Sequence, residues 1–219
     1  MSNTNEVLKV GGIVLCGGES SRMNYPKALL PMGKELMLQR IVRIVSTVVS
    51  PVIVVAAQGQ DLPQLPESVS VIYDKEPGGG PLSAIGQSLA ALQDQCDAAF
   101  VSACDTPLIQ AEFISTIISA LEDNQMVMVQ EGKWYHPLAA VYRTSLIQPI
   151  QRLLNKNYRR PIDLAENVKS CFLDAEALRE IDPQLRGLRN INTRDQYFEL
   201  LREAGLEHST KLPFEDARF

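Results

Sequence analysis

A chain of 219 residues falls within the size range of one domain, because a single hydrophobic core rarely grows beyond about 250 residues. Hydrophobic residues make up 45% and charged residues 21%, which excludes a disordered chain and predicts a globular core. The net charge of -5 argues against the broad basic face that nucleic-acid binding needs, so we expect no nucleic-acid partner. An anionic ligand must therefore meet cations that the fold places locally.

The sequence has four cysteines: Cys16, Cys96, Cys104 and Cys171. Their wide spacing without a CxxC pair disfavours a disulfide framework and a four-thiolate zinc site, so we expect a protein of the reducing cytoplasm. Residues 1–9 lack the basic start and apolar core of a secretory signal, and we expect them to be flexible. The most apolar stretch, Ile41–Ala57, contains Arg43 and Pro51 and is shorter than the roughly 20 residues of a membrane span, so we expect no membrane partner.

The first predicted element is a buried strand from Val10, a short apolar run closed by Gly17 and Gly18. Glu35–Ser50 has apolar residues at helical spacing, and Pro51 ends this helix before the β-branched strand Val52–Val55. Further strands are predicted at Val69–Tyr73, Ala98–Ala103, Met126–Gln130, Pro137–Tyr142 and Ser170–Leu173. Further helices are predicted at Leu82–Leu92, Ala111–Leu121, Leu146–Leu154, Pro161–Val168 and Arg194–Ala204.

Strands that alternate with helices of ten to fifteen residues predict βαβ units with right-handed crossovers. We therefore expect an α/β fold: a single Rossmann-like three-layer domain over residues 10–204, with a mostly parallel twisted sheet and helices on both faces. The predicted strands from Met126 to Tyr142 form a small hairpin extension, and residues 205–219 form a flexible tail. Ligands of such folds bind outside the carboxyl ends of the strands.

Gly17 and Gly18 follow a predicted buried strand, so their amides can approach phosphate oxygens without a side chain intervening. Four residues nearby supply hydroxyl donors or cations: Ser20, Ser21, Arg22 and Lys27. Together they favour a triphosphate site, whereas the glycine pair alone would favour a tight strand-to-helix turn. The spacing matches neither GxxxxGK[ST] nor GxGxxG, which excludes those two phosphate-binding loops.

Asp105 follows the predicted strand Ala98–Ala103, which places a carboxylate at the carboxyl end of the sheet. Magnesium ions that bridge nucleotide phosphates are held by such carboxylates. The alternative is an aspartate that serves only as a turn residue or helix cap before Pro107. We expect no Ser-His-Asp arrangement, because the sequence has two histidines, His136 and His208, and His208 lies in the tail.

Leu15–Met23, followed by Pro26–Leu30, resembles the LAGGxSxRMGxxK opening of molybdenum cofactor guanylyltransferases and related nucleotidyltransferases. Two positions differ from this pattern, since Cys16 replaces the motif's Ala and Asn24 its usual Gly. Asn tolerates left-handed backbone best among the other residues, so the second change is mild. The segment Ser102–Pro107 is similar to the xxCDxP segment of the same family.

Three further segments resemble the family. Asp74 with Gly80-Pro81-Leu82 is similar to its D…GxGPL loop, and His136-Pro137 to its HPxxAxY strand. Asn190–Asp195 is similar to its closing NxNTxxD motif. Each has a structural alternative: a mobile connection, a structural histidine, and a helix N-cap at Asn192 or Thr193. The family often has Asn after its second strand as part of the guanine pocket; this chain has Ala56 and Ala57, and Gln58 is a candidate substitute.

The resemblance implies that GTP reacts with molybdenum-bound molybdopterin to give the guanine dinucleotide cofactor and pyrophosphate, with Mg²⁺ as cofactor. It implies a nucleotide site formed by Leu15, Cys16, Gly17, Gly18, Ser20, Ser21, Arg22, Lys27, Asp74 and Asp105. Within it, catalysis would fall to Arg22, Lys27 and Asp105, the last as metal ligand. Acceptor binding would fall to Gly80, Pro81, His136, Asn190 and Asn192.

Two other functions remain open. A transferase that uses CTP on molybdopterin, or that acts on a sugar phosphate, would need the same loop and metal site. A nucleotide-binding module without turnover is the alternative from a different class, and the presence of Arg22, Lys27 and Asp105 argues against it. Molybdenum cofactor insertion proteins or molybdoenzymes are expected as transient partners, because they receive the cofactor.

Overall fold

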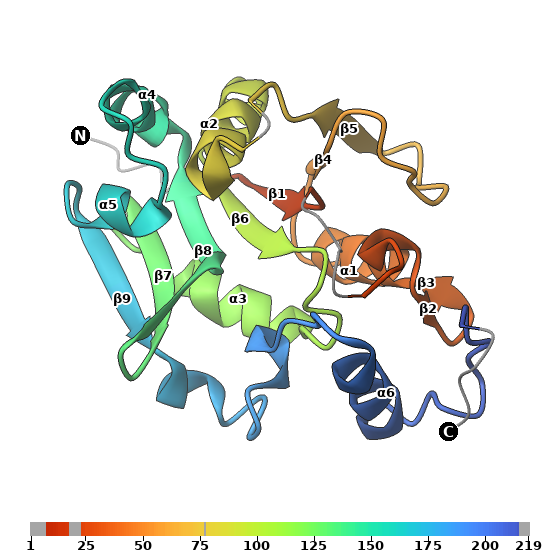
Figure 1. The fold of residues 1–219 in the computed structure, drawn as a ribbon. Helices are drawn as coiled ribbons and strands as arrows, with labels where there is room; N and C mark the ends of the chain where they lie inside the picture. Colours follow the sequence, from red (N-terminus) through yellow and green to blue (C-terminus); the bar gives the residue numbers. More distant parts are fainter. Residues whose placement is uncertain (1–7, 18–22, 77, 215–219) are drawn as a thin grey trace.

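In the computed structural model, which describes residues 8–17, 23–76 and 78–214, seven strands form one central sheet (Figure 1). These strands are β1 (Val10–Leu15), β4 (Val52–Ala56), β5 (Val69–Tyr73), β6 (Ala98–Ala103), β7 (Met126–Glu131), β8 (Trp134–Arg143) and β9 (Ser170–Asp174). Their spatial order is β5-β4-β1-β6-β8-β7-β9. Neighbouring strands run parallel except at β8, which is antiparallel to both β6 and β7. This arrangement confirms the predicted mostly parallel sheet.

The helices are α1 (Met37–Ser46), α2 (Gly80–Leu92), α3 (Ala111–Ser119), α4 (Ile147–Asn155), α5 (Pro161–Ala165) and α6 (Arg194–Glu203). Four short 3-10 helices accompany them: η1 (Lys27–Leu29), η2 (Thr144–Leu146), η3 (Ala175–Leu178) and η4 (Arg186–Leu188). A small antiparallel sheet pairs β2 (Pro31–Met32) with β3 (Glu35–Leu36). None of the helices in the described ranges combines the length and the apolar character that crossing a bilayer requires.

The helices cover both faces of the sheet and create two cores, as the three-layer prediction requires. On one face, apolar side chains of α1, α3 and α6 pack against the sheet. On the other face, the packing side chains come from α2, α4 and α5. Figure 1 shows the second group at the top and left and the first group toward the bottom and right. The central strands β4 and β6 are buried along their whole length, which explains their continuous apolar sequences.

Close packing at the centre depends on Gly12 in β1. A Cβ atom added at Gly12 would lie 2.7 Å from Cγ1 of Val45, which projects from α1. Two other valine methyl groups, of Val49 and Val52, would lie 3.1 Å away. The absence of a side chain at Gly12 therefore lets α1 approach the sheet.

The expected hairpin forms and extends the main sheet. Its turn contains Gly132 at φ 56°, and β8 then runs back beside β6, where Ala139 is paired with Ser102. The exposed side chains of Trp134 and Tyr135 lie at the hairpin end of β8.

Several helix boundaries differ from the sequence prediction, and those of α1 and α2 have a clear structural cause. Helix α1 begins at Met37 because Glu35 and Leu36 pair with β2, and it ends at Ser46, five residues before Pro51. Helix α2 begins at Gly80, because Pro81 fits the first turn of a helix, where its missing amide hydrogen costs nothing.

Residues 206–214, part of the predicted flexible tail, make packing contacts with the domain. Thr210 and Phe214 are buried at 9% and 8% exposure, and Leu206 and Leu212 pack against the core of the α1 face. The sequence gives no sign of these contacts, because the segment has no helical or strand periodicity and its apolar residues find partners only in the folded molecule. Residues 1–7 and 215–219 lie outside the described part of the chain.

Candidate nucleotide-binding site

The carboxyl ends of four parallel strands meet at one edge of the sheet. Leu15 at the end of β1 is in register with Val55 in β4 and Ala103 in β6, and Val55 is in register with Ile72 in β5. The predicted residues Cys16, Gly17, Asp74 and Asp105 follow these ends directly. The sheet therefore places segments that lie far apart in the sequence along a single edge, where α/β folds bind ligands.

Lys27 and Asp105 form a partly buried ion pair at this edge. The Nζ atom of Lys27 donates to Oδ2 of Asp105 over 2.7 Å, and the two side chains are 17% and 14% exposed. The same ammonium donates to Oδ1 of Asn192 over 2.8 Å. Thus three residues predicted independently, from three separate motifs, meet at one cation.

Asn192 is held in place by backbone contacts and by the start of α6. The amide of Ile191 donates to the carbonyl of Asp105 over 2.9 Å, and the amide of Asn192 donates to Oε1 of Gln196. The N-cap of α6 is Thr193, whose side chain accepts from the amide of Gln196. The helix-cap interpretation of this motif is therefore correct for Thr193, whereas the side chain of Asn192 contacts Lys27.

Asp105 retains one unsatisfied oxygen. Its Oδ1 atom is buried and has no hydrogen-bond partner among the described residues. Burying a carboxylate oxygen without a partner costs free energy. A hard cation such as Mg²⁺ would be a suitable partner, because it prefers oxygen ligands. In the described ranges no group of three or more acidic, histidine or cysteine side chains could hold a metal. A magnesium ion at Asp105 would therefore take its other ligands from phosphates and water, as Mg²⁺ usually does.

Gln60, which the sequence analysis did not single out, fixes the start of the glycine-rich loop. Its Nε2 atom donates to the carbonyl of Cys16 over 3.0 Å and to the Cys16 sulfur over 3.3 Å, while its Oε1 accepts from the amide of Ala57. Gln58, the candidate substitute for the family's Asn, is exposed and lines a surface groove beside Tyr73. Sequence alone could not separate these two glutamines, because both follow the same strand.

Two buried thiols lie behind the loop. Cys104 donates a hydrogen bond to Cys16, which lowers the pKa of Cys16 below that of an ordinary thiol. The same interaction, together with burial, raises the pKa of Cys104 well above its usual value. Cys16 is therefore the more acidic of the two.

Asp74 and the Gly80-Pro81 turn lie on the α2 side of the edge. Oδ1 of Asp74 accepts from the amide of Glu76 over 3.0 Å, which shapes the turn after β5. Gly80 has φ 75°, and a Cβ atom there would lie 3.0 Å from the carbonyl oxygen of Arg159. Only glycine fits this close approach without strain.

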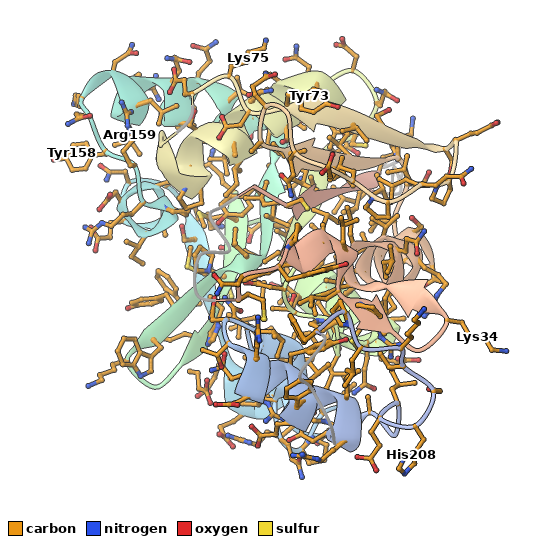
Figure 2. All side chains as sticks on the ribbon, turned by 45° about the vertical axis from the view of Figure 1, so that its right-hand side comes forward. Lys34, Tyr73, Lys75, Tyr158, Arg159 and His208 are labelled. Atoms are coloured by element: carbon orange, nitrogen blue, oxygen red, sulfur yellow. The ribbon has the colours of Figure 1, made fainter. Side chains whose placement is uncertain are left out.

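The loop that contacts Gly80 was another region to which the sequence analysis gave no role. Between α4 and α5 it carries three cations and one half-exposed ring: Lys156, Arg159, Arg160 and Tyr158. Tyr158 and Arg159 project side by side from this loop in Figure 2. The sequence shows that these cations lie close together in the chain, but only the fold shows that they lie beside the Gly80 turn.

His136 and Asn190 lie among residues other than the ion pair of Lys27 and Asp105. His136 lies on β8 with Nε2 3.5 Å from Oε2 of Glu131, and burial lowers its pKa although Glu131 opposes the shift. Asn190 is exposed and lines a pocket of about 200 Å³ with Arg186 and Arg189. Four predicted loop residues lie outside the described part of the chain: Gly18, Ser20, Ser21 and Arg22.

The arrangement is suited to binding an anion. A cation stands at the carboxyl edge of the sheet, held by a carboxylate and an amide oxygen, and the glycine-rich loop begins on the neighbouring strand. Phosphate groups of a nucleotide fit a site that offers backbone amides and an ammonium group.

Comparison with known families agrees with this geometry. The family described as MobA-like NTP transferase domain matches residues 12–168 of the chain. This range contains Lys27, Asp74 and Asp105, and it ends before Asn192.

Proteins of similar sequence occur in mycobacteria. A protein of Mycobacterium tuberculosis strain H37Rv, named "Probable molybdenum cofactor guanylyltransferase", is 37% identical over 194 residues, which cover 86% of this chain and 91% of that protein. A protein of Mycobacterium avium with the same name is 36% identical over 190 residues, covering 85% and 92%.

Solved structures share the fold at low sequence identity. Molybdopterin-guanine dinucleotide biosynthesis protein A from Archaeoglobus fulgidus has a TM-score of 0.71 at 19% identity, covering 89% of this chain and 98% of its own. The 4-diphosphocytidyl-2C-methyl-D-erythritol synthase of Anaerococcus prevotii has a TM-score of 0.66 at 13% identity, covering 90% and 99%. Identities this low establish the architecture and leave the nucleotide open.

Proposed function

The chain belongs to the MobA-like NTP transferase family and is a nucleotidyltransferase, and we propose that it transfers GMP from GTP to the terminal phosphate of molybdenum-bound molybdopterin. The products are the guanine dinucleotide cofactor and pyrophosphate. The observation that carries the proposal is the cluster of Lys27, Asp105 and Asn192, in which a cation and an unsatisfied carboxylate oxygen lie at the edge that follows the glycine-rich loop.

In this reaction an oxygen of the acceptor phosphate attacks the α-phosphorus of GTP. A new P–O bond forms there while the bond to the β-phosphate breaks, and pyrophosphate leaves with the bonding electron pair. Because the acceptor phosphate is already an anionic nucleophile, the enzyme needs neither a covalent intermediate nor a strong base. Catalysis then consists of alignment and charge stabilisation.

Lys27 is the residue suited to stabilising the charge on the leaving pyrophosphate. Its partners Asp105 and Asn192 aim the ammonium, so little reorganisation is needed when the ligand arrives. Asp105 would hold Mg²⁺ through its buried Oδ1, and the bound ion would neutralise phosphate charge as a Lewis acid. The loop amides at Gly17 and Gly18, the hydroxyls of Ser20 and Ser21, and Arg22 complete the proposed phosphate site.

The nucleoside would lie between β1 and β5. Leu15 ends β1 and Cys16 follows it, while Asp74 follows β5 on the other side of β4. Gln60 joins the backbone of Cys16 to Ala57, which follows β4. The choice of guanine rests on the names of the sequence relatives, because Ala56 and Ala57 occupy the place of the family's Asn.

The acceptor would approach from the α2 side. Gly80 and Pro81 start α2 against the loop that carries Arg159, whose cations suit a phosphorylated acceptor. His136, Asn190 and Asn192 remain proposed acceptor contacts, of which Asn192 is placed beside Lys27.

The nucleotide choice is tested by incubating the protein with molybdenum-bound molybdopterin, Mg²⁺ and each nucleoside triphosphate in turn. We expect pyrophosphate and the dinucleotide cofactor with GTP. Pyrophosphate with CTP and not GTP would instead establish a cytidylyltransferase. In a parallel incubation, a sugar phosphate replaces molybdopterin, and release only there would establish a different acceptor. Binding of a nucleotide without any product would point to a module that does not turn over.

The metal role is tested with Asp105→Asn. This variant keeps the shape of the side chain but removes the charge that Mg²⁺ and Lys27 require, so turnover should fall by at least about 100-fold. Its circular dichroism spectrum should remain that of the folded protein. Near-normal turnover at low Mg²⁺ would eliminate Asp105 as the metal ligand.

A further inference from the structure

The segment Leu206–Phe214, here called the C-terminal strap, leaves the end of α6 and crosses to the small sheet of β2 and β3. Figure 1 shows it running from α6 to the right-hand side, beside these two strands. In Figure 2, His208 lies on this segment and points outward at the bottom of the molecule, and Lys34 projects from the turn between β2 and β3. His208 on the strap thus faces solvent, whereas Thr210 faces the turn between β2 and β3.

One end of the strap is tied to the turn between β2 and β3. The amide of Gly33 donates to Oγ1 of Thr210 over 2.9 Å, and this hydroxyl donates in turn to the carbonyl of Leu206 over 2.7 Å. Gly33 adopts φ 68°, and a Cβ atom there would lie 3.2 Å from Cδ2 of Leu206. The turn after β2 therefore fits closely against the strap.

The other end of the strap places Phe214 between α6 and the segment that carries Lys27. The ring of Phe214 makes an edge contact with Tyr25 at 5.8 Å and with Tyr197 at 6.2 Å between ring centroids. The guanidinium carbon of Arg194 lies 4.2 Å from the centroid of the Phe214 ring. Nε of Arg194 donates to the carbonyl of Met23 over 3.4 Å.

These contacts bracket Lys27 on both sides in the sequence. Met23 and Tyr25 precede it, and Gly33 follows it. A further bond, from the hydroxyl of Tyr197 to the carbonyl of Pro31 over 2.6 Å, joins the same segment to α6. The local helix η1 has only three residues, so its own hydrogen bonds cannot fix where Lys27 lies. Tertiary contacts must do so.

We propose that the C-terminal strap is a positioning element for the nucleotide site, in which Phe214 and Thr210 hold the segment Met23–Gly33 where Lys27 reaches Asp105 and Asn192. Phe214 contacts both sides of the Lys27–Asn192 hydrogen bond: the Lys27 segment through Tyr25, and the first turn of α6 through Arg194. The expected effect on catalysis rests on the function proposed above. The expected ordering of residues 23–33 by the strap does not depend on that function.

The decisive variant is Phe214→Ala, with Phe172→Ala as matched control. Phe172 is also in contact with a tyrosine ring, Tyr135, but it lies exposed on β9, away from the strap. Hydrogen–deuterium exchange of the full chain should show faster exchange over residues 23–33 in Phe214→Ala, with β1 and β6 unchanged. Phe172→Ala should leave exchange over residues 23–33 unchanged, and Phe214→Trp should restore protection there.

Activity provides the second readout. Phe214→Ala should lower kcat for pyrophosphate release by about 10-fold and raise the Kd for GTP. In a Lys27→Met background, where the ammonium is absent, the same change should no longer weaken GTP binding, because residues that act through one another are not additive. An equal weakening in both backgrounds would overturn the positioning role.

The outcomes separate this proposal from the proposed function. Unchanged exchange over residues 23–33 in Phe214→Ala overturns the strap, whatever the enzyme transfers. Faster exchange across the whole sheet also overturns it, since Phe214 would then support overall stability alone. Faster exchange confined to residues 23–33 in a protein that releases no pyrophosphate from GTP would support the strap and refute the guanylyl assignment.

Discussion

The ammonium of Lys27 and the side-chain oxygen of Asn192 lie 2.8 Å apart, although 165 positions separate the two residues in the chain. The backbone next to Asn192 is also bonded to Asp105, the other partner of Lys27: the amide of Ile191 donates to the carbonyl of Asp105. The site is thus closed by a segment from the end of the domain, and the direction of the lysine depends on the start of α6.

Replacing Asn192 with Ala should reduce kcat/KM for pyrophosphate release by about 10- to 100-fold, since a hydrogen bond to a charged group contributes roughly 1.5–3 kcal/mol. The ammonium of Lys27 would keep Asp105 but lose the contact that aims it. Steady-state kinetics with GTP measure the effect. Gln95→Ala, an exposed amide residue beyond the end of α2, serves as control and should match the wild type. Equal rates for both variants would contradict the role of Asn192.

Gln60→Ala should raise KM for GTP by about 10-fold, with a smaller effect on kcat. The change removes the bridge from Ala57 to the carbonyl and sulfur of Cys16, so the first residues of the glycine-rich loop lose their anchor. The comparison is with Gln64→Ala, an exposed glutamine of the same connection, which should leave KM unchanged. A normal KM in Gln60→Ala would show that the loop is fixed by other contacts.

The stability of the protein should decrease in acid through His136. Burial keeps the pKa of folded His136 below that of the unfolded chain, so the unfolded state takes up the proton first. The contribution of neutral His136 to the free energy of unfolding is therefore fully present above about pH 6.5, the usual histidine pKa. It is lost as the pH falls from there through the lower pKa of the folded protein. Thermal midpoints between pH 8 and pH 5 should fall less steeply in His136→Gln.

The neighbouring Glu131 provides the check on this interpretation, because its carboxylate opposes the shift. Glu131→Gln should lower the pKa of folded His136 further and make the loss of stability at acid pH larger. A smaller loss in that variant would mean that the histidine is stabilised in its charged form.

Gly12→Ala should destabilise the fold by about 1–3 kcal/mol, the usual cost of overpacking a core. The added methyl group would meet Val45 of α1 at 2.7 Å and could be accommodated only by moving the helix. Urea unfolding measures the change. Ser70→Ala on the exposed side of edge strand β5 is the matched control and should stay within about 0.5 kcal/mol of the wild type.

Much of the fold could be predicted because local sequence patterns carry it. Continuous apolar runs such as Val52–Val55 form the buried parallel strands, and Pro81 lies in the first turn of α2. The start of α1 was misplaced because Glu35 and Leu36 pair with β2, and a pairing of two residues leaves no periodic pattern to detect. The packing of residues 206–214 was not visible in the sequence for the same reason, since it involves single residues such as Phe214.

The sequence likewise indicated some residues of the candidate site and gave no sign of others. Lys27, Asp105 and Asn192 were each found because they occur in short motifs, and the ends of parallel strands indicated that Asp105 and the loop would share an edge. Gln60 and the cations around Arg159 were missed, because no motif includes them and their roles depend on which backbone groups the fold brings beside them.

By itself, the sequence determined the chemistry that is available: a glycine-rich loop, two cations near it and a carboxylate after a buried strand, each fixed by residues within one short segment. Only the tertiary structure decided that Lys27 is shared between Asp105 and Asn192, and that residues 206–214 pack against the segment carrying it. The physical reason is that strand and loop preferences act between close neighbours in sequence. The direction of a long, flexible lysine side chain is instead set by partners that come together only when the sheet, α6 and the strap have packed.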